Sequence, residues 1–500
     1  MTVVVEDTIG ARTDAEWPSD DLAPPDGQAW DLLVIGGGTA GLVAGKTAAG
    51  FGASVLMVER DRIGGDCLWT GCVPSKALLS AAHATRDART ASRFGIRVGD
   101  VDVEFPAVMA HVRQAIATIE PTDSPTAMRA AGVMVSHRTA RLTGRQTAEV
   151  DDHAVRFRQA LVATGAAPVI PTIPRLSDAG PLTNETVFSL TELPARLLVL
   201  GGGAIGCELG QAFARLGSSV TIVEAAPRLL VREDPDAAAL VTAALAGDGV
   251  TIRSGVAVTA IRRRGGGWIA ELTDGTEVGF DTVLVAVGRR PRTTDLGLAA
   301  AGVDIDGHGF VCVDAQLRTT NPRIWAAGDV TGHPQFTHTA GVHGSLAASN
   351  AILGLRRRVE RATVPRVTFT QPEVAAVGVS LEQARSQALT VRTVAHVDVD
   401  RAIAEQQTSG FSRLILDGRG RVVGATIVGP RAGESLPEAV LAARHGLRAR
   451  DLAAATHAYP TYGDGVWKAA IEQVQAQLTG TAVHRLTTVL TAIRRRWVDR

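Results

Sequence analysis

Two cysteines five positions apart, Cys67 and Cys72, are the residues whose type and spacing best predict chemistry in this 500-residue chain. They follow a glycine-rich segment typical of dinucleotide binding, and this combination predicts a redox-active pair beside a flavin. Residues five apart in a regular helix have Cα atoms about 8.7 Å apart, beyond the roughly 7 Å limit for a disulfide. If the pair bonds, we therefore expect Cys67 in a loop, with Gly71 easing the bend. Cys72 and Pro74 would then begin a helix, whose N-terminus favours a thiolate.

Zinc binding and a structural disulfide are the alternative uses of this pair. Zinc sites need four ligands, and the other two cysteines, Cys207 and Cys312, lie apart in apolar stretches typical of core residues. We therefore predict no metal site. A structural disulfide needs an oxidising compartment, and the N-terminus has no features of a signal peptide, so we expect a cytoplasmic protein.

The dinucleotide-binding pattern occurs twice. The segments 31–60 and 196–225, aligned without a gap, are identical at nearly half of their positions. Each copy has an apolar strand, a G-x-G-x-x-G turn, a helix, and a second strand that ends in an acid at the same spacing from the first glycine. A single G-x-G-x-x-G is weak evidence, but two copies with the strands and the acid predict two bound dinucleotides. The glycines concerned are Gly36, Gly38 and Gly41 in the first copy and Gly201, Gly203 and Gly206 in the second.

The position of the cysteines predicts which nucleotide binds where. Cys67 follows shortly after Glu59, the acid of the first copy, so we assign FAD to the first copy and the nicotinamide cofactor to the second. Glu224 can accept a hydrogen bond from a ribose 2′-hydroxyl and would repel a 2′-phosphate, which favours NADH over NADPH. Arg228 lies close by in the sequence and opposes that preference.

Residues 30–478 resemble the pyridine nucleotide–disulfide oxidoreductases, the family of dihydrolipoamide dehydrogenase, glutathione reductase and mercuric reductase. The resemblance rests on the two copies of the dinucleotide-binding pattern, called fingerprints from here on, and on four further motifs. These are LVATG (161–165), VAVGRRP (285–291), TTNPRIWAAGD (319–329) and FTQPEVA (369–375). It implies an α/β fold with two Rossmann-type domains, for FAD and NAD, and a C-terminal α+β domain that forms a homodimer.

The resemblance also implies roles for individual residues. Electrons would pass from NADH through FAD to a Cys67–Cys72 disulfide, with Cys67 as the interchange thiol and Cys72 as the charge-transfer thiol. Lys76 and Glu208 match a pair near the flavin, although a surface lysine and a helix-capping glutamate are equally compatible with the sequence. The remaining positions that match cofactor-binding motifs are Thr164, Gly165, Gly288 and Asp329.

The C-terminal motif departs from that of the disulfide-reducing relatives, His-Pro-Thr-x-x-Glu, whose histidine serves the disulfide of the other subunit. Aligned on Pro-Thr, this chain has Tyr459 at the histidine position and Asp464 at the glutamate position. A tyrosine with a pKa near 10 costs about 4 kcal/mol to use as a base at pH 7, which predicts poor turnover of lipoamide or glutathione disulfide. His457 is a substitute base by type, but it lies about 7 Å away along an extended chain, so a satisfied loop histidine is the alternative. Mercuric reductases share the tyrosine, and their C-terminal cysteine pair is missing from this sequence.

Composition and layout agree with a multidomain α/β enzyme. The chain has 51 basic and 51 acidic residues and no apolar run long enough to span a bilayer, so neither nucleic-acid binding nor a membrane-spanning helix is predicted. We predict a flexible leader (1–29), FAD-binding segments (30–168 and 289–362), an NAD(P)-binding domain (169–288), a dimerisation domain (363–480) and a basic tail (481–500).

The tail has apolar residues at helical spacing and basic residues around them. This pattern predicts an amphipathic helix that contacts a membrane surface or docks on its own dimer. The apolar residues are Val483, Leu486, Leu490, Ile493 and Trp497, and the basic ones are His484, Arg485, Arg494, Arg495, Arg496 and Arg500.

Three functions are compatible with these patterns. The first is an FAD-dependent reductase that passes electrons from NADH through the cysteine pair to a disulfide, metal ion or other electrophile. The second is an NADH:quinone reductase whose flavin bypasses the cysteines. The third is a non-catalytic subunit that senses nucleotides within a complex. The first is the leading hypothesis. The basic tail and the missing histidine favour the second, and complete fingerprints together with both cysteines argue most strongly against the third.

Overall fold

The computed structural model describes residues 22–479 and 481–498, with only the backbone described for 481–484. The described part of the chain therefore excludes residues 1–21 of the predicted leader. In the predicted tail pattern it excludes the side chains of Val483 and His484 and the whole of Arg500. The chain divides into two compact units. The first comprises the residues up to Arg228 together with Asp248–Val359, and the second comprises Leu229–Gly247 together with Glu360–Arg500.

The first unit is built around a mainly parallel sheet with the strand order β3-β2-β1-β6, and β16 pairs with the other edge of β6. An antiparallel hairpin, β4 and β5, continues from the first half of β6. The strands span Trp30–Ile35 (β1), Val55–Glu59 (β2), Val133–His137 (β3), Ala140–Gly144 (β4), Thr147–Val150 (β5), His153–Val162 (β6) and Ile324–Ala326 (β16).

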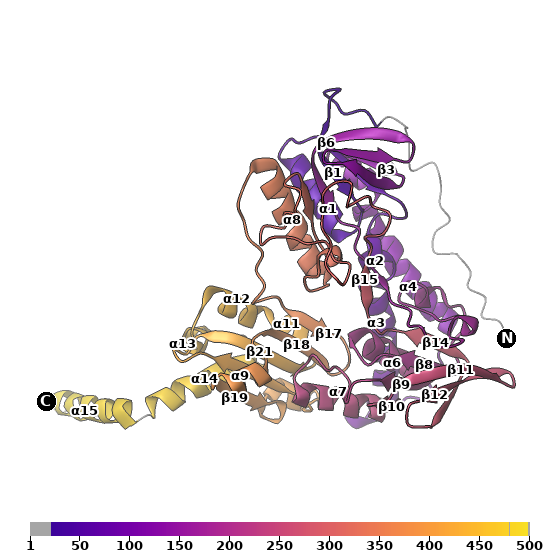
Figure 1. The fold of residues 1–500 in the computed structure, drawn as a ribbon. Coiled ribbons are helices and arrows are strands. Elements are labelled where there is room, and N and C mark those ends of the chain that lie inside the picture. Colours follow the sequence, from indigo (N-terminus) through magenta and orange to yellow (C-terminus); the bar gives the residue numbers. More distant parts are fainter. Residues whose placement is uncertain (1–21, 480, 499–500) are drawn as a thin grey trace. The chain divides into compact units, whose positions relative to one another are not determined.

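Both faces of this sheet are buried, because alternate residues of each strand enter different cores. Leu33 and Ile35 pack on one side with Phe157, whereas Leu32 and Val34 pack on the other. This explains why the strand sequences are continuously apolar, as parallel strands covered on both faces usually are. Helices α1 (Thr39–Gly50) and α8 (Thr337–Leu353) pack side by side, although they come from opposite ends of this unit's sequence (Figure 1).

Three further helices in this unit carry and support the cysteines. They are α2 (Gly65–Trp69), α3 (Cys72–Arg89) and α4 (Phe105–Ile119), and α5 (Pro125–Ala130) precedes β3. α3 packs against α4 and against α6 (Ala204–Leu216), the helix of the second fingerprint.

The second fingerprint forms its own parallel sheet with the order β10-β9-β8-β14, followed by the antiparallel sheet β11-β12-β13. A short antiparallel pair, β7 with β15, joins the two nucleotide-binding regions. These strands span Ala166–Pro168 (β7), Arg196–Leu200 (β8), Ser219–Glu224 (β9), Thr251–Ser254 (β10), Val258–Arg264 (β11), Gly267–Leu272 (β12), Glu277–Phe280 (β13), Thr282–Val285 (β14) and Arg289–Pro291 (β15).

The second unit contains an antiparallel five-stranded sheet with the order β17-β18-β21-β20-β19, covered by helices that bury Leu436, Leu452 and Val466. Helix α7 (Pro235–Gly247) groups with this unit although the sequence places it in the predicted NAD(P)-binding range, because Arg413 of β20 pairs with Asp234 and Asp236. The remaining elements are β17 (Arg366–Thr368), β18 (Glu373–Gly378), α9 (Leu381–Ser386), β19 (Thr390–Ala395), α10 (Asp400–Ala404), β20 (Phe411–Leu416), β21 (Val422–Gly429), α11 (Ala432–Ser435), α12 (Pro437–His445), α13 (Ala449–Ala454), α14 (Asp464–Leu478) and α15 (Thr481–Val498).

The two Rossmann-type sheets and the separate α+β unit confirm the predicted fold class. In the described part of the chain, no helix has both the length and the hydropathy needed to cross a membrane.

Candidate active site

The two fingerprint turns adopt nearly the same conformation. Gly36 and Gly201 have φ of 107° and 105°, in the region that favours glycine. A Cβ on Gly41 would lie 2.0 Å from the carbonyl oxygen of Gly36, and one on Gly206 would lie 1.9 Å from that of Gly201. Only glycine therefore permits these turns, which direct the N-termini of α1 and α6 toward a phosphate-sized ligand.

The acids at the ends of β2 and β9 are also held alike. Glu59 accepts hydrogen bonds from the backbone N–H groups of Gly37 (2.7 Å) and Asp61 (2.7 Å). Glu224 accepts the equivalent bonds from Gly202 (2.6 Å) and Ala226 (2.7 Å). Two pre-oriented carboxylates beside two glycine turns fit the ribose and pyrophosphate of two dinucleotides.

The segment with the cysteines packs directly on the first fingerprint turn. A Cβ on Gly65 would approach the Cα of Gly38 to 2.7 Å, so glycine is needed for the backbones to come this close. Trp69 closes the other side of α2, where its indole N–H donates to the carbonyl of Ile63 at 2.7 Å. The redox segment is thus fixed next to the turn predicted to hold FAD.

The prediction that Cys67 lies in a loop is wrong, because it lies in the separate five-residue helix α2. Gly71 follows that helix and caps α3 with a backbone conformation in which a Cβ would lie 2.6 Å from the carbonyl oxygen of Asp66. This break, rather than a loop, brings the two cysteines together. Cys72 begins α3 and Pro74 lies in its first turn, as the sequence predicted.

The two sulfurs are present as thiols and interact with each other. The hydrogen bond from Cys67, helped by Thr337 and Lys76, lowers the pKa of Cys72 to about 6. The same bond, together with burial, raises the pKa of Cys67. The Sγ of Cys72 also lies 3.2 Å from the hydroxyl of Thr337 at the start of α8. Of the two cysteines, Cys72 is therefore the one that ionises first.

Lys76 and Glu208 form an ion pair at 2.9 Å, one turn along α3 from Cys72. Glu208 is buried within α6 and does not cap that helix, so the helix-cap interpretation is wrong. Lys76 stabilises the Cys72 thiolate, and Glu208 opposes it.

Arg289, in the VAVGRRP motif, is the centre of a network of charged residues. Arg289 forms ion pairs with Asp66, the neighbour of Cys67, and with Asp329 at 3.7 Å, and it donates to the carbonyl of Ala166 at 2.7 Å. Burial raises the pKa of Asp329, and Arg289 opposes that shift. The Asp329 carboxylate is therefore linked through Arg289 to Asp66, the residue next to Cys67.

Three more predicted cofactor positions, Thr164, Gly165 and Gly288, directly precede the paired strands β7 and β15. The Thr164 hydroxyl donates to the carbonyl of Arg292 (2.7 Å), and the Arg292 N–H donates back to the carbonyl of Gly165 (3.0 Å). Gly288, with φ of 140°, directly precedes β15.

Gly203 is the N-cap of α6, and a Cβ built on it would have no heavy atom within 4 Å. This open space leaves room for the approach of a nucleotide.

The predicted acid–base residues, Tyr459, His457 and Asp464, all lie in the second unit. The Tyr459 hydroxyl is exposed and donates to Asp400 at 2.5 Å, which raises the pKa of the tyrosine. Both ring nitrogens of His457 are engaged, by Glu438 at 2.8 Å and by the carbonyl of Ala455 at 3.0 Å. This geometry fits the satisfied loop histidine. Although burial favours the neutral ring, the bond to Glu438 raises the pKa of His457.

Asp464 begins α14 and is almost fully buried. Its Oδ2 accepts from the backbone N–H of Thr461 at 3.3 Å, and among the described residues its Oδ1 has no hydrogen-bond donor. Tyr462, three positions after Tyr459, is in the core and donates to Glu405 at 2.9 Å.

Three residues of this site were not predicted: Thr337, Arg289 and Asp66. Thr337 is far from Cys72 in the sequence and lies outside every motif, so no sequence signal pointed to it. Arg289 lies inside the VAVGRRP motif and Asp66 precedes Cys67, so a charged residue in each of these two segments was the available signal.

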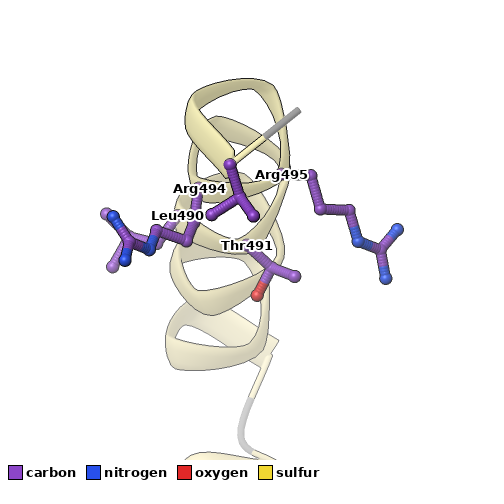
Figure 2. Close-up of a pocket in the computed structure, with 5 residues that line it drawn as sticks. Leu490, Thr491, Arg494 and Arg495 are labelled. Atoms are coloured by element: carbon purple, nitrogen blue, oxygen red, sulfur yellow. The ribbon is translucent and has the colours of Figure 1, made fainter. Parts of the chain in front are cut away.

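A surface depression on α15 is a separate feature. It is lined by Leu490, Thr491, Arg494, Arg495 and Val498, and contains none of the residues above (Figure 2).

Two dinucleotide-binding turns, with a reactive cysteine pair packed against the first, define a flavin-dependent dithiol oxidoreductase. The family model "Pyridine nucleotide-disulphide oxidoreductase" matches residues 30–344, and the model for the dimerisation domain of the same family matches residues 364–470. The chain belongs to this family. It is an FAD-dependent oxidoreductase that uses NAD(P)H, and its dimerisation domain supports a homodimer.

Two of the relatives are matched over nearly their full length. The chain is 38% identical to a mercuric reductase of Streptomyces lividans over 453 residues, which cover 88% of this chain and 95% of that protein. It is 34% identical to a dihydrolipoyl dehydrogenase of Geobacillus stearothermophilus, with 91% and 98% covered. Among solved structures, a Cu(II) complex of the HOCl-induced flavoprotein disulfide reductase RclA from Escherichia coli matches with a TM-score of 0.79 at 28% identity, covering 87% and 98%. These relatives support the cysteine-dependent reductase rather than the quinone or non-catalytic alternatives.

The low pKa of Cys72 predicts a specific titration. In the reduced protein, alkylation of Cys72 should reach half its maximal rate near pH 6, whereas an ordinary cysteine does so near pH 8.5. Because only the thiolate reacts, the rate should rise as pH rises through this value and fall below it. Mass spectrometry of iodoacetamide-treated protein measures this without any bound cofactor.

Thr337→Val removes one bond to the thiolate and should shift this titration toward higher pH. A midpoint above pH 8 in the unaltered protein would show that Cys72 is not activated.

Proposed function

We propose that this enzyme reduces a soft, thiophilic metal ion more readily than it reduces a disulfide. The observation that carries the proposal is the contrast between the cysteine pair and the residue at the position of the family's base. The hydrogen bond from Cys67 lowers the pKa of Cys72 to about 6, but the position of the family's base holds a tyrosine that is already bonded to Asp400. A soft metal ion that binds the two sulfurs displaces the proton of Cys67 to solvent and needs no acid, whereas disulfide exchange must deliver a proton to its leaving thiolate.

The residues then have the following proposed roles. The first fingerprint, Glu59 and Asp329 bind FAD, which when bound supplies two-electron chemistry between NAD(P)H and the cysteines. Cys67 meets the acceptor, Cys72 is held as a thiolate facing the cofactor, and Lys76 with Glu208 sets the local charge. In the same scheme residues 30–168 and 289–362 bind FAD, 169–288 bind the nicotinamide nucleotide, and 363–480 form the dimer.

A comparison of acceptors under identical conditions tests this proposal. NADH oxidation by the purified holoenzyme should be faster with thiol-complexed Hg(II) or Cu(II) than with lipoamide or a simple quinone. Faster lipoamide turnover would contradict the metal assignment and would show that Tyr459 or His457 acts as a base. Quinone turnover that persists in Cys67→Ser would favour a route that bypasses the cysteines.

We propose NADH as the preferred reductant, because Glu224, held by two backbone bonds, matches the acid that accepts a ribose 2′-hydroxyl and would repel a 2′-phosphate. The kcat/KM for NADH should exceed that for NADPH by about tenfold or more. Glu224→Ala should reduce this preference about tenfold, whereas Arg228→Ala should increase it. Steady-state kinetics with both nucleotides measures the ratio, and a wild-type preference for NADPH would reverse the assignment.

Two kinds of partner are proposed for the homodimer: a small thiophilic acceptor at the cysteines, and a membrane surface at residues 481–500. The second is independent of the chemistry of the acceptor. A cytoplasmic location is also proposed, since thiols of this kind stay reduced there.

A further inference from the structure

Helix α15 has an apolar face that the described part of the chain leaves uncovered. Leu486, Val489, Leu490, Ile493 and Trp497 are each more than half exposed. At about 100° per residue they fall within an arc of about 100° on one side of the helix. The structure thus confirms the amphipathic helix and adds Val489 to the predicted apolar residues. These five residues are called the apolar stripe. Five large apolar side chains on one face form a contiguous exposed patch, and such a patch marks an interaction surface, unlike single apolar residues scattered over a surface.

The arginines of α15 flank this stripe. On the same helical projection Arg494 lies about 80° to one side of Leu486, and Arg496 and Arg485 lie about 80–100° to the other. Arg495 lies opposite the stripe, and Figure 2 shows Arg494 and Arg495 projecting to opposite sides of the helix. Flanking arginines extend their long side chains toward a polar layer while the stripe between them is buried.

The charge of the helix narrows the choice of partner. The helix contains four arginines and neither aspartate nor glutamate. Pairing with the same helix of a second copy would bring two such sets of arginines together without an opposing acid in either helix. A surface with a negatively charged outer layer and an apolar interior can bury the apolar residues of the stripe and form ion pairs with the arginines.

From this arrangement we infer that α15 binds flat on an anionic lipid surface, with Leu490, Ile493 and Trp497 in the acyl boundary and Arg485, Arg494 and Arg496 on the headgroup phosphates. The inference deepens the proposed membrane contact and does not depend on the acceptor reduced at the cysteines. It makes the protein a peripheral reductase, held at the bilayer by its C-terminal helix.

Co-sedimentation of the full-length holoenzyme with lipid vesicles tests the inference. Vesicles of phosphatidylcholine with one-third phosphatidylglycerol should bind the protein, and pure phosphatidylcholine should bind it at least about tenfold more weakly. Each flanking arginine changed to glutamine should weaken binding about fivefold. NADH oxidation, measured without vesicles, should be the same in every tail variant, so failure of lipid binding is distinguishable from failure of the proposed reaction.

A matched pair of variants separates the apolar contact from charge. Ile493→Gln should weaken binding about tenfold, and Thr491→Gln, on the opposite side of the same helix, should leave it nearly unchanged. Equal binding to neutral and anionic vesicles, or no binding to either, would overturn the inference. So would a lower oligomeric mass of Ile493→Gln in the absence of lipid, because it would show that a second copy of the chain covers the stripe.

Discussion

Changing Cys67 to serine is expected to lower NADH-driven reduction of metal ions and disulfides by about a thousandfold or more. A thiolate is the nucleophile and the soft ligand in both reactions, and a serine hydroxyl can replace it in neither. The effect should be this large because Cys67 and Cys72 act as a unit, so losing one sulfur removes the function of both. Initial rates with thiol-complexed Hg(II) and with lipoamide measure it.

Two controls make the result specific. Cys312→Ser is the same chemical change at a half-buried cysteine away from the site, and it should leave the rate within about twofold. Bound flavin, read from visible absorbance, should be unchanged in Cys67→Ser, since Gly65 and Gly38 hold the segment in place without the sulfur. A Cys67→Ser protein that keeps full metal reduction would remove the cysteine pair from the mechanism.

The fold was largely predictable because its signals are local. The glycines of each turn, the apolar strands and the terminal acid lie within one short segment of the chain, and the structure forms the same turn twice. The start of α3 at Cys72 was predictable for the same reason, because helix N-termini have short-range requirements. The five-residue α2 was not, since its existence depends on close packing of Gly65 against Gly38, a contact between segments separated in the sequence.

The parts of the site that sequence reasoning missed depend on tertiary structure. Thr337 reaches Cys72 because α8 packs on α1, and Arg289 reaches Asp66 because β15 returns beside β7. Neither contact has a fixed spacing in the chain. The same limit explains Tyr459 and Tyr462, which are three positions apart in the sequence, whereas one is exposed and the other is in the core.

The departure at Tyr459 can be reversed. Tyr459→His is expected to raise lipoamide turnover by about 100-fold to 1,000-fold, because a neutral imidazole is available at pH 7 whereas ionising the tyrosine costs about 4 kcal/mol. The environment increases that cost, since the Tyr459 hydroxyl donates to Asp400 and its pKa is raised.

We expect Asp464 to be the partner of the introduced imidazole. Its carboxylate raises the pKa of Tyr459, and its buried Oδ1 accepts no hydrogen bond from the described residues. A carboxylate in this position can hold an imidazole in one orientation and stabilise its protonated form. Asp464→Asn combined with Tyr459→His should therefore lose about tenfold of the gain, which kinetics with lipoamide at pH 7 would show.

Tyr459→Phe is the control that decides between a missing base and an active tyrosine. It keeps the ring and removes the hydroxyl, so lipoamide turnover should stay at its low level and metal reduction should change by less than about threefold. If the phenylalanine variant instead loses a substantial lipoamide activity, the tyrosine is itself the acid or base, and the preference for metal ions would need another cause. If Tyr459→His gains nothing while Asp464 is intact, the limit lies in access of the disulfide to Cys67 rather than in proton transfer.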